Sequence, residues 1–148
     1  MMLKYYTFFS FLSYFFLLST YNTGTIQLEV QNIKPSKGNI KVAIFGSEDD
    51  FLVDDKAIQG HSVATTNSDK LTIRLEDLPF GTYSIAIYQD LNNNNKLDTN
   101  LFGIPKEPYG FSNNARSKWG PPKYEIAKFE LNQKVLNISA AVKVWTKQ

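Results

Sequence analysis

The chain has 148 residues, no cysteine, one histidine and a formal net charge of +2. This composition excludes a disulfide framework, a thiolate metal site and a zinc site built from several histidines of this chain. Because the Lys and Arg residues are scattered rather than clustered, the small positive charge does not indicate a nucleic-acid-binding surface.

The first residues have the composition of an export signal. Lys4 precedes an apolar block over residues 8–18, which has the length of a signal-peptide core and is short for a bilayer span. We expect a signal peptide over residues 1–23, cleaved between Ser19 and Gly24, and one periplasmic or extracellular domain over residues 24–148 with no membrane span. That length supports one hydrophobic core. An uncleaved anchor is the alternative.

Beyond residue 24, apolar and polar residues alternate in short runs separated by turn residues. The runs cover residues 26–30, 40–44, 61–65, 71–75, 83–88 and 136–144. Alternation with a period of two is typical of strands, and residues 51–58 favour at most one short turn of helix. The spacing predicts an all-β fold, a single antiparallel β-sandwich of about seven strands.

Oxygen-bearing side chains recur directly after the run at residues 83–88. Asp90, Asn92 and Asn94 occupy alternate positions, and Asp98 follows them. Together with the backbone carbonyl of Lys96, they have the spacing of the first five ligands of a calcium-binding loop. The sequence therefore predicts a Ca²⁺ site over residues 90–98.

The predicted calcium loop differs from an EF-hand in its last position. Leu101 stands where an EF-hand has its bidentate carboxylate, so we expect weak binding, with a Kd of about 10⁻⁴–10⁻³ M. The acidic residues Glu48, Asp49 and Asp50 would supply a missing ligand if their loop lies alongside. The alternative is an Asn-rich loop that closes on itself through hydrogen bonds from backbone to side chain, without a metal.

Residues 100–124 interrupt the strand pattern. Four prolines and three glycines exclude a regular ladder, yet the segment is too aromatic for a solvated linker, which indicates a long ordered loop. Its aromatic, amide and guanidinium groups suit a glycan or protein partner at the cell envelope. The candidate binding residues are Tyr109, Phe111, Asn113, Asn114, Arg116 and Trp119. Alternatively, the loop caps the open end of the sandwich and Arg116 and Trp119 are its exposed contacts; the residues that would then turn inward are Phe102, Ile104, Tyr109 and Phe111.

Two sets of motifs resemble known families. Residues 78–83, Leu-Pro-Phe-Gly-Thr-Tyr, are similar to the strand-entry signature of transthyretin-like and Cna-B-like sandwiches. Residues 40–51, 78–83, 90–98, 102–114 and 119–122 together resemble an exported bacterial family, domain of unknown function 2141. Membership would imply an extracytoplasmic β-sandwich and no established activity. The chain departs from the family at Asn95, where Gly is usual.

No motif in the chain predicts catalysis. There is no phosphate-cradling, dinucleotide-binding or Gly-x-Ser-x-Gly motif, and His61 beside Ser62 does not make a triad. We therefore expect a non-enzymatic exported module. The alternatives are a structural envelope component and a hydrolase or isomerase that uses acidic residues with Arg116 or His61. Titratable groups gathered in one concave pocket would favour the enzyme.

Overall fold

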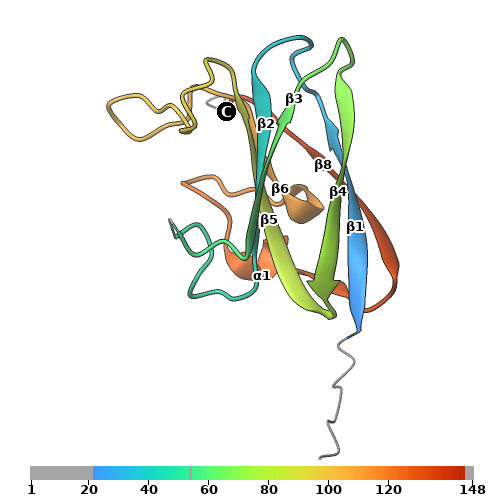
Figure 1. Ribbon diagram of the computed structural model, residues 1–148. Helices are drawn as coiled ribbons and strands as arrows, with labels where there is room; N and C mark the ends of the chain where they lie inside the picture. The colour runs from blue at the N-terminus through green and yellow to red at the C-terminus, as the bar shows by residue number, and fades with distance from the viewer. Residues whose placement is uncertain (1–21, 54, 146–148) are drawn as a thin grey trace, which may run out of the picture.

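The computed structural model describes residues 22–53 and 55–145, so the predicted signal peptide over residues 1–23 lies almost entirely outside the described residues. Within the described part, the fold is nearly all β, with eight strands in two sheets (Figure 1). The strands are β1 (Thr23–Gln31), β2 (Asn39–Phe45), β3 (Gln59–Ala64), β4 (Lys70–Pro79), β5 (Gly81–Asp90), β6 (Tyr109–Phe111), β7 (Phe129–Leu131) and β8 (Val135–Ala141). Two short helical turns are η1 (Ser112–Asn114) and α1 (Tyr124–Ala127).

The six alternating runs are all strands, but one pairing differs from the antiparallel expectation. The first sheet has the order β4-β1-β8, and the second has the order β3-β2-β5-β6 with β7 also on β5. β1 pairs with β4 in antiparallel fashion and with β8 in parallel, with Leu28 opposite Ile138. The parallel pairing arises because the chain reaches β8 by a crossover from β7 on the other sheet, the kind of connection that parallel neighbours require.

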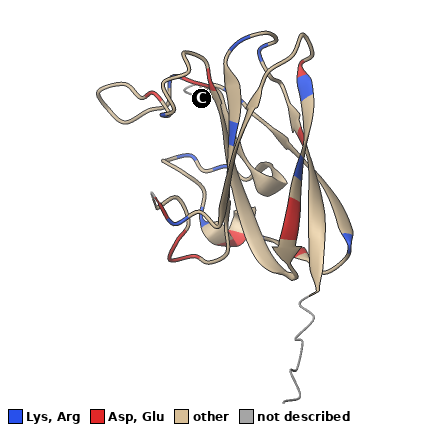
Figure 2. Cartoon of the chain, in the orientation of Figure 1, with Lys and Arg blue, Asp and Glu red and all other residues tan. Residues whose placement is uncertain are grey.

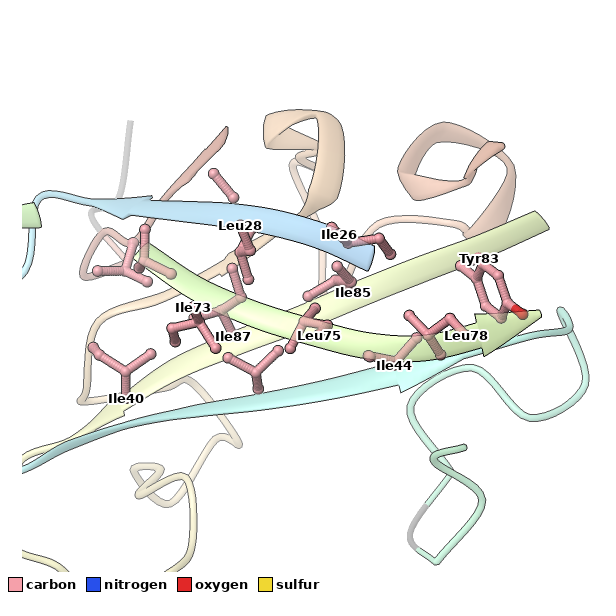
Figure 3. Close-up of a cluster of buried hydrophobic side chains, with 14 of the residues drawn as sticks. Ile26, Leu28, Ile40, Ile44, Ile73, Leu75, Leu78, Tyr83, Ile85 and Ile87 are labelled. Carbon is pink, nitrogen blue, oxygen red and sulfur yellow. The ribbon is translucent and has the colours of Figure 1, made fainter. Parts of the chain in front are cut away.

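The two sheets share one apolar core. Alternate residues of β1 and β4 point toward alternate residues of β2 and β5, as Figure 3 shows for Ile26, Leu75, Ile44 and Ile85. The fully buried aliphatic side chains of this core come from both sheets and include Ile26, Leu28, Ile40, Ile44, Leu75, Leu78, Ile85 and Leu131. At about 1.5–3 kcal/mol for each buried aliphatic side chain, this shared core is the main source of stability.

The chain passes from the first sheet to the second at the corner between β4 and β5. Phe80 is the one residue between the two strands. The hydroxyl of Tyr83 donates a 2.7 Å hydrogen bond to the carbonyl oxygen of Pro79, which ties the corner to the strand that follows. Burial raises the pKa of Tyr83 above its ordinary value of 10.0. The signature at residues 78–83 therefore lies where the chain passes from one sheet to the other.

A second, smaller apolar cluster covers the outer face of β5. The ring of Phe51, from the loop after β2, meets Phe45, Phe111 and Tyr124 edge to face at 5.7, 6.1 and 5.7 Å between ring centroids. The buried hydroxyl of Ser112 accepts a hydrogen bond from Ile85 N (2.9 Å) and donates to the carbonyl oxygen of Ala127 (2.6 Å). The loop around Phe51 is held by single turns and contains no helix among its described residues.

The Pro- and Gly-rich segment contains a strand that its composition was expected to exclude. β6 pairs with Ala86–Tyr88 of β5, and Tyr109 exchanges two backbone hydrogen bonds with Lys143 (3.0 and 2.9 Å). Gly110 makes this possible, because a Cβ atom there would lie 2.5 Å from the carbonyl oxygen of Ala141. No helix in the described residues is long and apolar enough to cross a membrane.

Candidate functional site: the loop after β5 and the segment that follows

The buried carboxylate of Asp90 organises the loop that follows β5. Asp90 is fully buried, and its two oxygens accept hydrogen bonds from the backbone N–H groups of Asn94 (3.1 Å) and Asn95 (2.9 Å). Asn93 and Asn95 have φ values of 59° and 62°, in the left-handed region that Asn tolerates better than most residues. The loop therefore curls back over its own first residue.

The other predicted ligands converge at the surface of this loop. Asn92 and Asn94 donate from their amide nitrogens to the two oxygens of Asp98, at 2.7 and 3.0 Å. The backbone N–H of Lys96 donates to the side-chain oxygen of Asn94 at 2.9 Å, and its ammonium-bearing side chain is exposed. The structure thus gathers Asn92, Asn94 and Asp98 in one place above Asp90, held by hydrogen bonds among themselves.

Glu107 is the residue of this region that sequence reasoning missed. Its carboxylate is 3% exposed and accepts backbone hydrogen bonds from Leu91 (2.7 Å) and Asp98 (3.0 Å), the two ends of the loop. One feature of the sequence points to it: Glu107 is the one acidic residue in residues 100–124. Burial raises the pKa of Tyr88 above 10.0, and the nearby charges of Asp90 and Glu107 raise it further.

Asp90 and Glu107 are balanced by backbone dipoles rather than by cationic side chains. Among the described residues, neither carboxylate forms an ion pair with Lys or Arg. In the same part of the chain, no group of three or more His, Cys, Asp or Glu residues is gathered closely enough to hold a metal ion. A Ca²⁺ ion here would therefore depend on Asn side-chain oxygens and backbone carbonyls in addition to Asp90 and Asp98.

Most of the predicted binding residues in the segment 100–124 have structural contacts. Phe111 is buried against Phe51. The Asn113 amide donates to the carbonyl oxygen of Lys128 at 2.7 Å, and the side-chain oxygen of Asn114 accepts from the backbone N–H of Ala141 at 2.8 Å. These contacts fasten the segment to α1 and β8, so its backbone is ordered.

The remaining predicted residues lie at the surface. Arg116 donates to the carbonyl oxygen of Ala141 at 3.2 Å, and its guanidinium carbon lies 5.8 Å from the ring centroid of the half-buried Tyr109. Trp119 is 88% exposed on a turn in which the Ser117 hydroxyl bonds its backbone. Phe102 is also 88% exposed, so it does not turn inward as the capping alternative requires.

A family model described as uncharacterised proteins conserved in bacteria, DUF2141, matches residues 28–139, which include the loop after β5 and all of residues 100–124. The chain belongs to the DUF2141 family. Comparisons with curated proteins and with solved structures gave no match.

In this DUF2141 domain, the acidic residues Glu48, Asp49 and Asp50 do not lie beside the loop after β5. Along β2, Asn39 is opposite Asp90 and Phe45 is opposite Ser84. The acidic cluster follows Phe45, about 20 Å of extended strand away from Asp90, and Figure 1 shows the two loops near opposite ends of the sheets. The cluster would complete the calcium site only if its loop lay alongside residues 90–98, and the fold does not bring the two loops together.

His61 lies in a groove between the edges of the two sheets of the DUF2141 domain. This open groove of about 380 Å³ is lined by Gln59, Gly60, His61, Arg74 and Glu76. The Arg74 Nε atom already bonds a Glu76 carboxylate oxygen at 2.9 Å, and the His61 ring lies 3.2 Å from the side-chain oxygen of Gln59. Three titratable groups thus share one concave surface, but two of them are paired with each other.

Proposed function

We propose that this chain is an exported, non-enzymatic module that binds a glycan or protein partner at the cell envelope through the surface around Trp119. One observation carries the proposal: Trp119 is 88% exposed in a segment whose backbone is fastened to α1 and β8 by Asn113, Asn114 and Arg116. A large aromatic side chain on an ordered backbone binds with little loss of conformational entropy. The beginning of the chain, with the composition of an export signal, supports the location.

The test of partner binding compares the wild type with Trp119→Ala on glycan and peptide arrays. Binding should fall at least tenfold in the variant, while its unfolding midpoint should stay unchanged because the ring makes little contact with the protein. Val135→Ala, at an exposed position on β8, is the matched control. Equal array signals for the wild type and Trp119→Ala would remove the proposed binding surface.

We also propose that a Ca²⁺ ion binds weakly to Asp90, Asn92, Asn94, the carbonyl of Lys96 and Asp98, and stiffens the root of the segment. The proposal is supported by two buried carboxylates, Asp90 and Glu107. Among the described residues, neither of them forms an ion pair with Lys or Arg. The convergence of Asn92, Asn94 and Asp98 supports it further, since it brings two amide side chains and a carboxylate together at the surface of the loop.

The calcium test measures the thermal unfolding midpoint in 5 mM Ca²⁺ and in EDTA. At a Kd of about 10⁻⁴–10⁻³ M, this concentration should stabilise the wild type by about 1–2 kcal/mol. Asp98→Asn should abolish the gain, since it removes a charged ligand while keeping the size of the side chain. Asp69→Asn, on an exposed turn, should keep it. A wild-type unfolding midpoint that is the same in Ca²⁺ and in EDTA would rule out the ion.

The arrangement of the sheets supports a finer classification, a β-sandwich of the transthyretin-like or Cna-B-like type. We base this inference on the core shared by the two sheets and on the Tyr83 hydroxyl that ties the corner between β4 and β5. The enzyme alternative draws support from the groove around His61, Arg74 and Glu76. We favour binding because that groove is open to solvent, whereas small-molecule sites enclose most of their ligand.

A further inference from the structure

Two of the three most exposed large apolar side chains of the described residues lie together at the end of a hairpin. Leu101 is fully exposed and Phe102 is 88% exposed. They occupy the turn of a narrow hairpin over residues 98–106, which Figure 1 shows in golden yellow, reaching away from both sheets. We call Leu101 and Phe102 the apolar tip. Neither partner binding around Trp119 nor a bound calcium ion is needed for the inference that follows.

The hairpin is ordered, so the exposure of the apolar tip is built into the fold. Thr99 and Pro105 form a β-bridge, and Lys106 N donates to the carbonyl oxygen of Asp98 at 2.8 Å. Asn100 closes the turn, because its side-chain oxygen accepts from the N–H groups of Phe102 (2.8 Å) and Ile104 (3.1 Å). Gly103 supplies the left-handed residue, with a φ of 73°. These hydrogen bonds keep both apolar side chains exposed to water, which is unfavourable. Burying the two side chains against another surface would therefore lower the free energy.

Positive charge lies behind the apolar tip. Lys96 and Lys106 are exposed on the approach to the hairpin, and neither forms an ion pair within the described residues. The nearby carboxylates are less exposed than the lysines: Asp98 is half-buried and accepts hydrogen bonds from two Asn amides, and Glu107 is buried. Figure 2 shows the turn itself without charged residues. The hairpin thus ends in two exposed apolar side chains, and the two exposed lysines lie behind them along the chain.

We propose that the apolar tip inserts into the interface of a lipid bilayer that contains anionic headgroups. Interfacial anchors place apolar side chains about 5–10 Å deep, at the boundary of headgroups and acyl chains, with Lys or Arg at headgroup level. Lys106 lies four positions after Phe102, at most about 13 Å away along the chain, which is compatible with that spacing. The chain then touches a membrane from one side without spanning it.

A lipid surface fits this tip better than a protein partner. A specific protein interface buries about 800 Å² on each side, whereas the apolar tip has two side chains, flanked directly by Asn100 and Gly103. A bilayer needs no complementary shape, so two inserted side chains and two cations suffice for weak, reversible binding.

The experiment uses the full chain with a tryptophan reporter at the apolar tip. Phe102→Trp is made together with Trp119→Phe and Trp145→Phe, so that the reporter is the only indole. Vesicles of phosphatidylcholine with phosphatidylglycerol should shift its emission to the blue, and lipids brominated on the acyl chains should quench it. A reporter that keeps its emission with saturating vesicles overturns the proposal. A blue shift that grows with protein concentration and needs no lipid also overturns it, because a second copy then covers the tip.

Further substitutions in the reporter chain separate the apolar and electrostatic contributions. Leu101→Ser should raise the lipid concentration for a half-maximal shift at least about tenfold. Lys96→Gln and Lys106→Gln should each raise it about fivefold on anionic vesicles only. Val135→Ser, at a 44% exposed position on β8, is the matched control and should leave it unchanged. An unchanged half-maximal concentration for Leu101→Ser overturns the proposal, whatever other segment holds the chain on the vesicle.

Discussion

At the scale of single residues, buried polar side chains hold the functional region together. Asp90 and Glu107 accept four backbone hydrogen bonds between them, at both ends of the loop after β5. Gln89, also fully buried, bonds both the N–H and the carbonyl oxygen of Lys34 (2.9 and 2.8 Å). Each of these side chains replaces a backbone partner that an irregular loop lacks, which is why burial does not leave those groups unsatisfied.

Glu107→Gln should destabilise the protein by about 1–3 kcal/mol, as measured by urea unfolding. A glutamine has one acceptor oxygen, so it can satisfy either Leu91 N or Asp98 N and must turn an amide N–H toward the other. The control is Glu130→Gln, an exposed position on β7 that should change stability by less than about 0.5 kcal/mol. Equal stability of both variants would show that Glu107 does not hold the loop closed.

At the scale of elements, a short strand converts the Pro- and Gly-rich segment into part of the fold. β6 lies between β5 and the chain that follows β8, and it hydrogen-bonds to both. η1 continues directly from β6 and is joined to β5 and α1 through Ser112. The segment from residue 109 to residue 116 is therefore rigid, while the apolar tip before it and Trp119 after it project into solvent.

Gly110→Ala should lower the free energy of unfolding by about 1–3 kcal/mol, because its Cβ atom would lie 2.5 Å from the carbonyl oxygen of Ala141 and push β6 away from β8. Gly60→Ala in β3 is the matched control, since a Cβ atom there meets nothing within 4 Å. Chemical denaturation of both variants measures the difference. If the two variants unfold alike, the close approach of β6 to Ala141 is not required for stability.

At the scale of the whole molecule, three tyrosines that are buried or half-buried link stability to alkaline pH. Burial raises the pKa values of Tyr83, Tyr88 and Tyr124 above 10.0. For Tyr124, the charge of Lys128 opposes this rise, whereas for Tyr88 the charges of Asp90 and Glu107 add to it. The folded state thus favours the protonated phenols more than the unfolded state does.

Stability should therefore fall as the pH rises above about 10. A phenol whose folded pKa lies above its unfolded value binds more protons in the folded state across that window, so the free energy of unfolding decreases with pH. Urea unfolding at pH 8, 9, 10 and 11 measures the effect, and Tyr88→Phe should reduce its slope. A flat profile up to pH 11 would contradict the assigned directions.

The sequence alone determined the strands of the central core, because a period of two reports local burial directly. All six alternating runs are strands, and residues 90–98 form a loop closed by hydrogen bonds from its own backbone to Asp90. Short-range patterns of this kind depend on neighbours in the chain, so they are visible without the fold.

The tertiary structure decided the contacts between distant segments. It paired β1 with β8 in parallel, inserted β6 beside β5, placed Glu107 rather than Glu48–Asp50 beneath the loop, and left Phe102 in water. These outcomes depend on which chain segments, separated by long stretches of sequence, come to share an edge of a sheet. A local pattern of residues carries no record of that choice, because the partner that satisfies each backbone group lies elsewhere in the chain.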